Sequence, residues 1–291
     1  MPNVELGQAI SQSFRFVGTA WSRAWGILLI LVWVTAAIQA VQGLRPEWGF
    51  MPFLGMLLSA AASTAAVGAL YRVGIEGAHG GDPDFQAHTG GLQWGGLEWR
   101  VLGANLLIGL MFGGVAAVVG VIWVIVLGIS AQSQAADLQA LGGNDQTAGM
   151  TALMHILGGP AGIGTLVILL PSLCAFVYFG ARLSLFTLAA ADTRSFSLGR
   201  AWSLTKGAVL AIILTMMLIY LVLFLAGALA GVIGGVIGAV AQQGGQGAAV
   251  WGLGGGQTIG AALSAPLVAG LQLYIYNTRR PGDAGIAATF A

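Results

Sequence analysis

Long apolar stretches separated by short polar segments are the dominant pattern of this chain. A helix that crosses the hydrocarbon core of a bilayer needs roughly 20 mainly apolar residues. Six stretches meet this requirement, at about 25–43, 51–72, 101–130, 160–188, 207–240 and 250–276. The pattern therefore predicts an all-α fold, a polytopic transmembrane helical bundle of about six spans. The alternative is five spans, with one of the longer stretches forming a re-entrant segment.

The residues before the first span follow a different pattern. Between residues 4 and 24, apolar side chains recur at helical spacing with polar ones between them, which predicts an amphipathic helix in the membrane interface. We expect residues 1–24 to form a cytoplasmic interfacial helix, residues 25–276 a six-span membrane domain, and residues 277–291 a cytoplasmic tail. A second basic interfacial helix is expected at 193–206. The apolar positions of the first helix are Val4, Leu6, Ile10, Phe14, Val17 and Trp21.

A short internal repeat links the two interfacial segments. Residues 18–26 align without a gap on residues 199–207, and five of the nine positions are identical. Each copy precedes an apolar span and ends on a glycine, Gly26 or Gly207, which permits a sharp change of chain direction. We interpret the repeat as a duplicated unit of interfacial helix, turn and span. The alternative is convergent use of Trp, Ser and Gly at a membrane surface.

Composition excludes a soluble globular protein and a nucleic-acid-binding protein. The 291 residues are 57% apolar and only 7% charged, and their mean hydropathy is +0.87. Soluble domains carry about 25% charged residues. A net charge of +1 supplies no basic stripe for nucleic acid. The 47 glycines suit helices that pack closely within a membrane.

The distribution of basic residues predicts the orientation of the chain. On a six-span arrangement, ten of the eleven Lys and Arg residues fall on one side of the membrane, and only Arg45 falls on the other. The 131–159 and 241–249 connections contain no Lys or Arg. Because basic residues concentrate in cytoplasmic segments, both termini and the 73–100 and 189–206 loops are expected in the cytoplasm.

Cationic and tryptophan side chains gather in these cytoplasmic segments. Basic residues at a membrane surface attract anionic lipid, and Trp prefers the headgroup level. Membrane lipids are therefore the expected partner. A protein partner, or a homo-oligomer through glycines at GxxxG spacing, is the alternative. The candidate lipid- or interface-binding residues are Arg15, Trp21, Arg23, Arg182, Arg194, Arg200, Trp202 and Lys206.

Ionisable residues are absent from the centres of the predicted spans, although some lie at span ends. This removes the usual apparatus of proton-coupled transport and of intramembrane proteolysis. The uncharged polar residues within the spans have two interpretations. They form hydrogen bonds between helices, or they line a path for a neutral solute. The candidates for such a path are Asn105, Gln257 and Gln272.

The loop between the second and third predicted spans holds a cluster of potential metal ligands, His79, Asp82, Asp84 and His88. Imidazole and carboxylate groups bind zinc and other divalent ions. However, the Gly-Gly-Asp-Pro sequence at 80–83 is typical of a solvent-exposed turn. We favour the turn, and we expect no resident metal and no cofactor.

Two motifs give a resemblance to a known family. Arg182-Leu183-Ser184-Leu185 stands at a span end, and residues 200–207 read Arg-Ala-Trp-Ser-Leu-Thr-Lys-Gly before the next span. This pattern resembles an uncharacterised family of bacterial multi-span membrane proteins, which includes the membrane domain fused to some glycerophosphoryl diester phosphodiesterases. Ala201 stands where the family usually has Ser, and Leu188 where Pro is common. The clear match covers about 26 residues.

The resemblance implies a multi-span α-helical protein of the bacterial inner membrane, without a known molecular role. The phosphodiesterase activity does not carry over, because the spans leave no room for a (β/α)8 barrel. We therefore expect a non-enzymatic scaffold or accessory protein that interacts with lipid or a partner. A transporter or channel for a neutral or lipidic solute is the alternative. A membrane enzyme that uses the loop from His79 to His88 is a third hypothesis.

Overall fold

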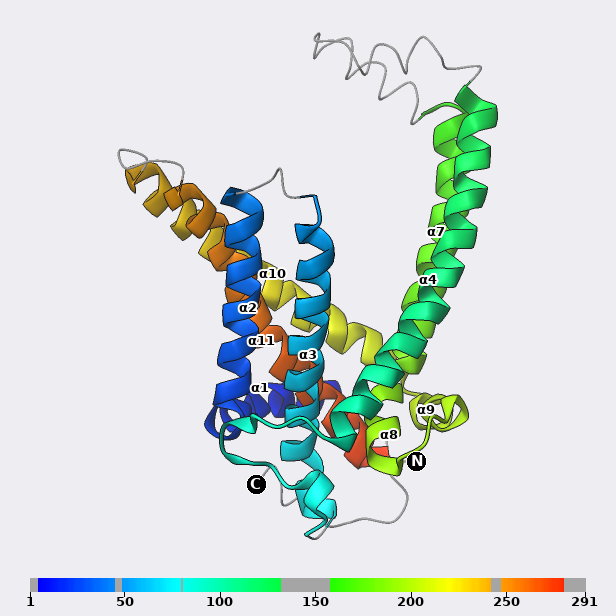
Figure 1. Ribbon diagram of the computed structural model, residues 1–291. Helices are drawn as coiled ribbons and strands as arrows, with labels where there is room; N and C mark the ends of the chain where they lie inside the picture. The colour runs from blue at the N-terminus through cyan, green and yellow to red at the C-terminus, as the bar shows by residue number, and fades with distance from the viewer. Residues whose placement is uncertain (1–4, 45–48, 80, 132–157, 242–246, 280–291) are drawn as a thin grey trace. The chain divides into compact units, whose positions relative to one another are not determined.

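The computed structural model describes residues 5–44, 49–79, 81–131, 158–241 and 247–279. Within these ranges all regular secondary structure is helical, which confirms the all-α prediction. The long helices occupy the stretches that hydropathy selects (Figure 1). They are α2 (Trp25–Leu44), α3 (Met51–Ile75), α4 (Gly96–Ala131), α7 (Pro160–Leu183), α10 (Val209–Ala241) and α11 (Gly247–Arg279). Most of the predicted 131–159 connection lies outside the described residues.

Four helical segments of the described chain are long and apolar enough to cross a membrane. They are Met51–Ala78, Gly96–Val126, Gly162–Thr193 and Val209–Leu229. A fifth is reached if α1 (Leu6–Arg23) and the following Trp25–Val41, bent by 96°, count as one span. The side chains of the first part of α11 lie outside the described residues, so the count of six spans stays a prediction.

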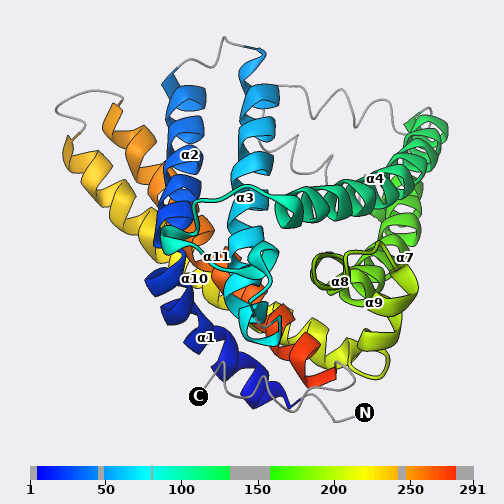
Figure 2. The ribbon, with the colours of Figure 1, turned by 60° about the horizontal axis from the view of Figure 1, so that its bottom comes forward.

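The helix expected before the first span is α1, which turns through 96° into α2 (Figures 1 and 2). The turn lies at Ala24, whose φ of −117° and ψ of 23° leave the helical path. Gly26, which the repeat assigns to the turn, lies inside α2 instead. In the second copy the prediction holds better, because Gly207 has a φ of 78° and separates α9 (Leu198–Thr205) from α10.

The predicted span at 160–188 is interrupted: α7 stops at Leu183, and α8 (Phe186–Thr193) begins after a two-residue break. Two side-chain hydrogen bonds account for the break. Ser184 Oγ donates to the Ala181 carbonyl at 2.9 Å, and Gln272 Nε2 donates to the Ser184 carbonyl at 2.8 Å. The helix is therefore irregular at Ser184 and Leu185, while Gly162–Thr193 still counts as one segment that is long and apolar enough to span a membrane.

The chain forms two compact units. Unit 1 comprises residues 1–105 and 181–291, and unit 2 comprises residues 106–180. In unit 2, the later part of α4 packs along α7. Trp123 Nε1 donates to Thr165 Oγ1 at 3.1 Å, and the rings of Phe112 and Phe176 stack 5.5 Å apart.

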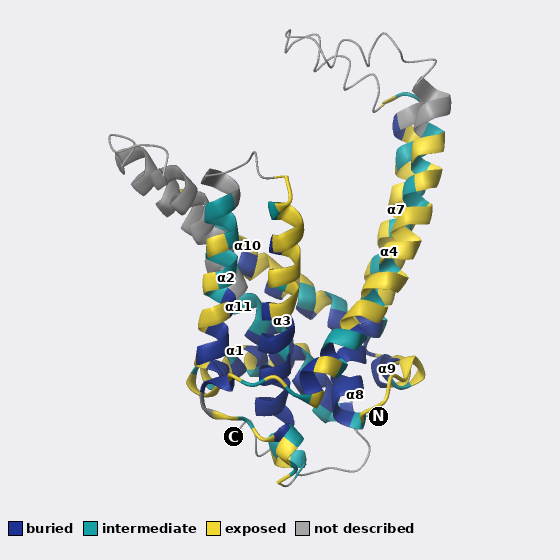
Figure 3. Cartoon of the chain, viewed as in Figure 1, coloured by how far each residue is buried: buried dark blue, intermediate teal, exposed yellow. Residues whose placement is uncertain are grey.

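The core of unit 1 forms around α11, which packs against α10, α1, α2 and α3. Its largest fully buried side chains include Phe16, Tyr71, Phe186 and Tyr276. Burial is concentrated near α1 and the adjoining end of α3, and the outer faces farther along α2 and α3 are exposed (Figure 3).

Large apolar side chains cover much of the exposed helical surface. Trp33, Leu210 and Phe224 are each at least 70% exposed. In contrast, Ser13 and Thr215 are buried, and each donates its hydroxyl to the carbonyl four residues earlier. Continuous exposed apolar surface is unusual for a protein in water. This arrangement, apolar outside and hydrogen-bonded polar groups inside, suits an apolar surrounding medium.

The crossing of α1 over α11 requires a glycine. A Cβ atom at Gly270 would lie 2.9 Å from Phe16 Cβ and 3.1 Å from Ser13 Cα. Both distances are shorter than ordinary van der Waals contact, so the two helices approach as closely as their backbones allow. Gly270 of α11 thus forms part of the surface against which α1 packs.

This crossing yields a stability prediction. Gly270→Ala is expected to destabilise the folded protein by about 1–3 kcal/mol, because the added methyl group overpacks the crossing. Gly18→Ala in α1 is the matched control, since a Cβ there meets nothing within 4 Å. Thermal unfolding of the purified protein should show a lower Tm for the first variant only. Equal Tm values would contradict the close crossing.

Candidate functional site

All charged residues whose side chains the structure describes belong to unit 1. The segments that carry them lie together at one end of that unit (Figures 1 and 2). These segments are α1, α8, α9, the loops beside them, the last turns of α3, α7 and α11, and the start of α4. Arg45 and Arg280 lie outside the described residues. We call this region the charged end.

Residues 76–94, which we call the clasp, connect α3 to α4 across the charged end. The clasp contains three short 3-10 helices, Glu76–Ala78, Pro83–Phe85 and Thr89–Gly91. Gly81 has a φ of 99°, and the Asp82 side chain accepts a hydrogen bond from the Asp84 N–H at 3.0 Å. The predicted turn chemistry is therefore present in residues 81–85.

The far end of the clasp explains the glycine at position 26. A Cβ atom on Gly26 would lie 2.9 Å from the Gly90 carbonyl oxygen and 3.1 Å from Leu92 Cγ. The clasp backbone thus rests directly on the first turn of α2. Gly26 is needed for this contact and not for the turn that the repeat predicts.

A buried ion pair anchors the base of the clasp. The Arg72 and Glu98 side chains are only 4% and 0% exposed, and their Nη2 and Oε2 atoms lie 2.6 Å apart. Arg72 Nη1 also contacts Glu98 Oε1. Arg72 Nε donates to the Asp84 carbonyl at 2.9 Å, and the Gly95 N–H donates to Glu98 Oε2 at 2.8 Å. The pair therefore joins α3, the clasp and α4.

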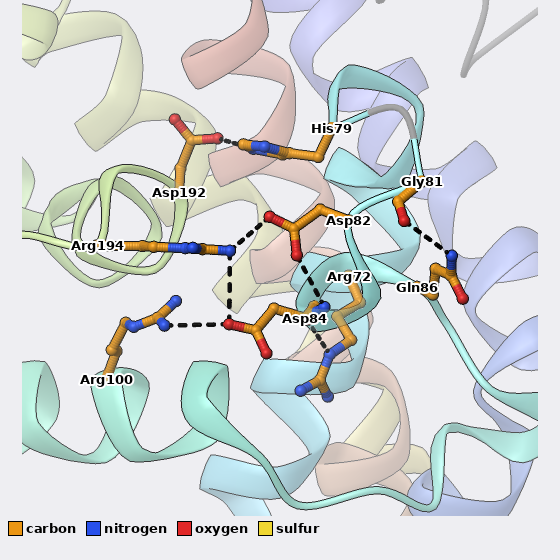
Figure 4. A network of polar contacts seen from close by, with 9 residues as sticks. All are labelled: Arg72, His79, Gly81, Asp82, Asp84, Gln86, Arg100, Asp192 and Arg194. Carbon is orange, nitrogen blue, oxygen red and sulfur yellow. Dashed lines mark hydrogen bonds and ion pairs between the residues drawn. The ribbon is translucent and has the colours of Figure 1, made fainter.

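Two further arginines hold the acidic turn of the clasp (Figure 4). Arg194 Nη2 bonds Asp82 Oδ2 and lies 3.5 Å from Asp84 Oδ2. Arg100 Nη2 lies 3.2 Å from the same Asp84 oxygen. Arg194 has a φ of 56°, a backbone conformation that a non-glycine residue rarely adopts, and its guanidinium lies 5.5 Å from the centre of the Phe85 ring. These contacts fix the turn against α4 and the α8–α9 loop.

A histidine–carboxylate pair completes the attachment of the clasp. His79 Nε2 lies 2.7 Å from Asp192 Oδ1, and Tyr276 donates its hydroxyl to Asp192 Oδ2 at 2.5 Å. The Asp192 side chain is 1% exposed. The His79 ring stacks on Phe85 with centroids 3.8 Å apart. The clasp, α8 and α11 thus meet at one buried carboxylate.

The structure directs the four potential metal ligands to different partners. His79 bonds Asp192, Asp82 and Asp84 face arginines, and His88 bonds Gln93. Over the described ranges, no group of three or more His, Cys, Asp and Glu side chains is arranged to hold a metal ion. Of the four residues that the sequence singles out, only Asp82 and Asp84 are held by guanidinium groups.

The eight candidate interface residues divide into three groups. Three of them are engaged within the fold: Arg23 pairs with Glu76 at 3.1 Å, Arg194 holds Asp82, and Trp21 packs against the core. By contrast, the side chains of Arg15, Arg200 and Lys206 make no ion pair in the part of the chain that the structure describes.

The last two candidates, Arg182 and Trp202, contact each other. The Arg182 guanidinium lies 4.7 Å from the centre of the Trp202 ring and donates to the Trp202 carbonyl at 3.3 Å. Thr205 Oγ1 in turn donates to the Arg182 carbonyl at 3.2 Å. The two halves of the motif at 182–207 are therefore in direct contact.

Two candidates for a polar path form bonds between helices. Asn105 Oδ1 accepts from Thr187 Oγ1 at 3.1 Å, which joins α4 to α8. Gln272 accepts from the Tyr71 hydroxyl at 2.7 Å and donates to the Ser184 carbonyl. These contacts support the interhelical interpretation for both residues. The side chain of Gln257 lies outside the described residues.

Comparison of this chain with protein-family models, with curated proteins and with solved structures gives no match. The resemblance carried by residues 182–207 therefore stays a prediction.

Sequence reasoning missed the pairing of Arg72 with Glu98 and the roles of Asp192 and Tyr276. One signal was present for the first pair, because residues of opposite charge stand at neighbouring span ends, Arg72 at the end of one and Glu98 at the start of the next. No comparable signal marks Asp192, which follows an apolar run, or Tyr276, which ends one. Asp192 contacts both His79 and Tyr276, and hydropathy carries no information on contacts between residues so far apart in the chain.

The buried pair yields a prediction with a matched control. Glu98→Gln is expected to destabilise the protein by about 3–5 kcal/mol, because it leaves the Arg72 charge buried without a counter-charge. Glu76→Gln, which removes the partner of the half-exposed Arg23, should cost about 0–1 kcal/mol. Chemical unfolding of both variants measures the difference. Similar losses would mean that the Arg72–Glu98 pair is solvated. The double variant Arg72→Met with Glu98→Leu should recover most of the lost stability.

The histidine–carboxylate pair predicts where the clasp opens. Asp192→Ala removes the acceptor of both His79 and Tyr276, so amide hydrogen exchange in residues 76–86 is expected to rise about 10-fold or more. Ser195→Ala, close in sequence but outside this contact, is the control. If amide exchange in the clasp of Asp192→Ala stays at the wild-type rate, the arginines alone keep the clasp in place.

Proposed function

We propose that this chain is a non-enzymatic integral membrane protein of the bacterial inner membrane. It acts as a scaffold or accessory protein that holds a rigid helical platform against the cytoplasmic surface. The platform consists of α1, the clasp, α8 and α9. The observation that carries the proposal is the placement of all described charged residues at one end of unit 1, beside long apolar helices.

Exposed tryptophans support a membrane surface at the level of the platform. Trp25 at the start of α2, Trp94 and Trp99 around the start of α4, and Trp202 in α9 are 37–61% exposed. Trp94 and Trp99 contact each other edge to face, with centroids 5.6 Å apart. Tryptophan is enriched where apolar tails meet headgroups. These residues therefore suit a belt at the bilayer boundary.

The sign of the charges supports the cytoplasmic orientation. Nine of the eleven basic residues have described side chains, and all nine belong to segments of the charged end. The described carboxylates of this end number six. Segments rich in Lys and Arg that flank membrane spans are retained on the cytoplasmic side, and carboxylates contribute little to this bias. We infer that both termini lie in the cytoplasm.

The contacts within the platform favour a structural role. Its carboxylates are engaged by arginines, His79 and Tyr276, which fix helices and loops in place. A transporter ranks second, because Asn105 and Gln272 are used in bonds between helices.

We further propose kinship with the bacterial membrane-protein family that residues 182–207 resemble. The contact between Arg182 and Trp202 supplies a physical reason for the motif, because it locks α9 to the end of α7.

A labelling experiment tests the orientation. In a Cys174→Ala background, Ser197→Cys places a thiol at an exposed residue of the platform, and Gly49→Cys places one before α3. A membrane-impermeant maleimide applied to intact cells whose outer membrane has been permeabilised should label position 49 and not position 197. Inside-out vesicles should reverse the pattern. Labelling of position 197 from the periplasmic side would refute the proposal.

A further inference from the structure

The first helix, α1, leaves large apolar side chains outside the core. Leu6 and Phe14 are 37% and 45% exposed, and Ile10 between them is half-buried. Their four-residue spacing places the three side chains on one side of the helix. They belong neither to the core cluster of unit 1 nor to the half-buried residues that pack against it. We call this stripe the α1 apolar face.

A neighbouring sector of α1 makes the contact with the rest of the fold. Its buried residues are Ala9, Ser13, Phe16 and Ala20, and three of these four are small. A helix that packed onto a protein in water would also bury its other large apolar side chains, because these gain most from leaving water. The α1 apolar face therefore needs an apolar partner from outside the described fold.

The bend after α1 indicates where this partner lies. The segments Leu6–Arg23 and Trp25–Val41 meet at 96° (Figure 1), so α1 lies close to the membrane plane when α2 runs across the bilayer. On α2, Trp25, Leu29 and Trp33 repeat at four-residue spacing and are 43–74% exposed. Exposed apolar stripes therefore occupy both arms of the bend, and one continuous apolar medium can cover both.

The rest of the α1 surface is polar but carries little charge. It consists of Gln, Ser, Thr and Gly residues with two cations, Arg15 and Arg23, and α1 contains no acidic residue. Arg23 is paired with Glu76, whereas Arg15 makes no ion pair with the described residues. A single cation attracts anionic lipid weakly, while apolar side chains gain from insertion whatever the headgroup is. Apolar insertion therefore dominates the interaction of α1 with lipid.

A second copy of the chain fits the α1 apolar face less well. Eight residues of helix at about 1.5 Å each give the face a length of about 12 Å. A stable protein interface buries roughly 800 Å² on each partner, which three partly exposed side chains cannot supply. Acyl chains require no such minimum area, because they surround each side chain separately.

We propose that the α1 apolar face inserts among the upper acyl chains of the adjacent leaflet, and that it recognises loose acyl packing rather than headgroup charge. Leu6, Ile10 and Phe14 enter spaces between the chains, and Arg15 stays at the aqueous side. Insertion that depends on apolar side chains is sensitive to lipid packing. This inference rests on the proposed function, because it requires α2 to cross the membrane.

Site-directed spin labelling of the full-length protein in phosphatidylcholine vesicles tests the insertion. In a Cys174→Ala background, the label is attached at Phe14→Cys, or at Arg15→Cys as the matched position in the polar sector. Collisions of the label with oxygen, which dissolves in lipid, are compared with collisions with a water-soluble nickel chelate. The oxygen-to-nickel ratio at position 14 is expected to be about 10-fold that at position 15, because an inserted face lies about 5–10 Å into the leaflet.

A label at Trp33→Cys, an exposed position of α2, serves as the membrane reference. Adding cholesterol tightens the acyl chains, so the ratio at position 14 relative to position 33 is expected to fall about 3-fold. Replacing half of the phosphatidylcholine by phosphatidylglycerol, or adding Arg15→Gln, should change the ratio at position 14 less than about twofold.

Four results would overturn the proposal. Equal ratios at positions 14 and 15 would place the face in water. Spectral broadening between labels at position 14 that persists in a large excess of lipid would show that a second copy covers the face. A ratio that rises with phosphatidylglycerol and falls in Arg15→Gln would mean that charge governs insertion, and a ratio that ignores cholesterol would exclude recognition of packing.

The reference label separates this proposal from the proposed function. If position 33 is also exposed to the nickel chelate, the membrane placement of α2 is wrong and the proposed function fails. If position 33 lies in lipid while position 14 lies in water, only the insertion of α1 is refuted.

Discussion

The charged end depends on one buried interaction, the ion pair of Arg72 and Glu98. Removing two charges from water is costly unless they meet each other and their remaining hydrogen-bonding groups find partners. Here the Asp84 carbonyl and the Gly95 amide complete the pair, and both belong to the segment that joins α3 to α4. The pair is therefore satisfied only when the clasp lies in place. A single electrostatic requirement thus turns a glycine-rich connection into a fixed part of the fold.

The distribution of charged residues also explains why the exposed surface of the charged end is positive. Two carboxylates of this end, Glu98 and Asp192, are buried against Arg72 and His79, and Asp82 and Asp84 are paired with Arg194 and Arg100 nearer the surface. Basic residues outnumber them, so the surplus that remains at the surface is positive. A surface of this kind needs no exceptional composition: the whole chain carries a net charge of only +1. The surplus arises because nine basic residues and only six carboxylates with described side chains gather at this end.

Hydropathy and helical spacing were sufficient to predict the long helices, the amphipathic α1 and the position of the second interfacial helix. Hydropathy and helical spacing both depend on whether each residue prefers an apolar or an aqueous environment, and both can be read within one short stretch of sequence. The contacts of the site join residues far apart in the chain, such as His79 with Asp192 and Tyr71 with Gln272, so no local pattern announces them. Gly26 shows the limit most clearly. Its repeat partner Gly207 does form a turn, whereas Gly26 is small because the clasp backbone lies against it.

The packing of α1 against α11 has a consequence for the order in which the protein assembles. Ribosomes deliver the chain from its N-terminus, so α1 emerges long before the glycine at position 270 against which Phe16 and Ser13 pack. Until α11 has been made, the face of α1 that packs on Gly270 lacks this partner. An amphipathic helix in that state can lie at a membrane surface. Packing of α11 against α1 therefore fixes α1 at a late stage of assembly, after α2, α3 and α10 have been made.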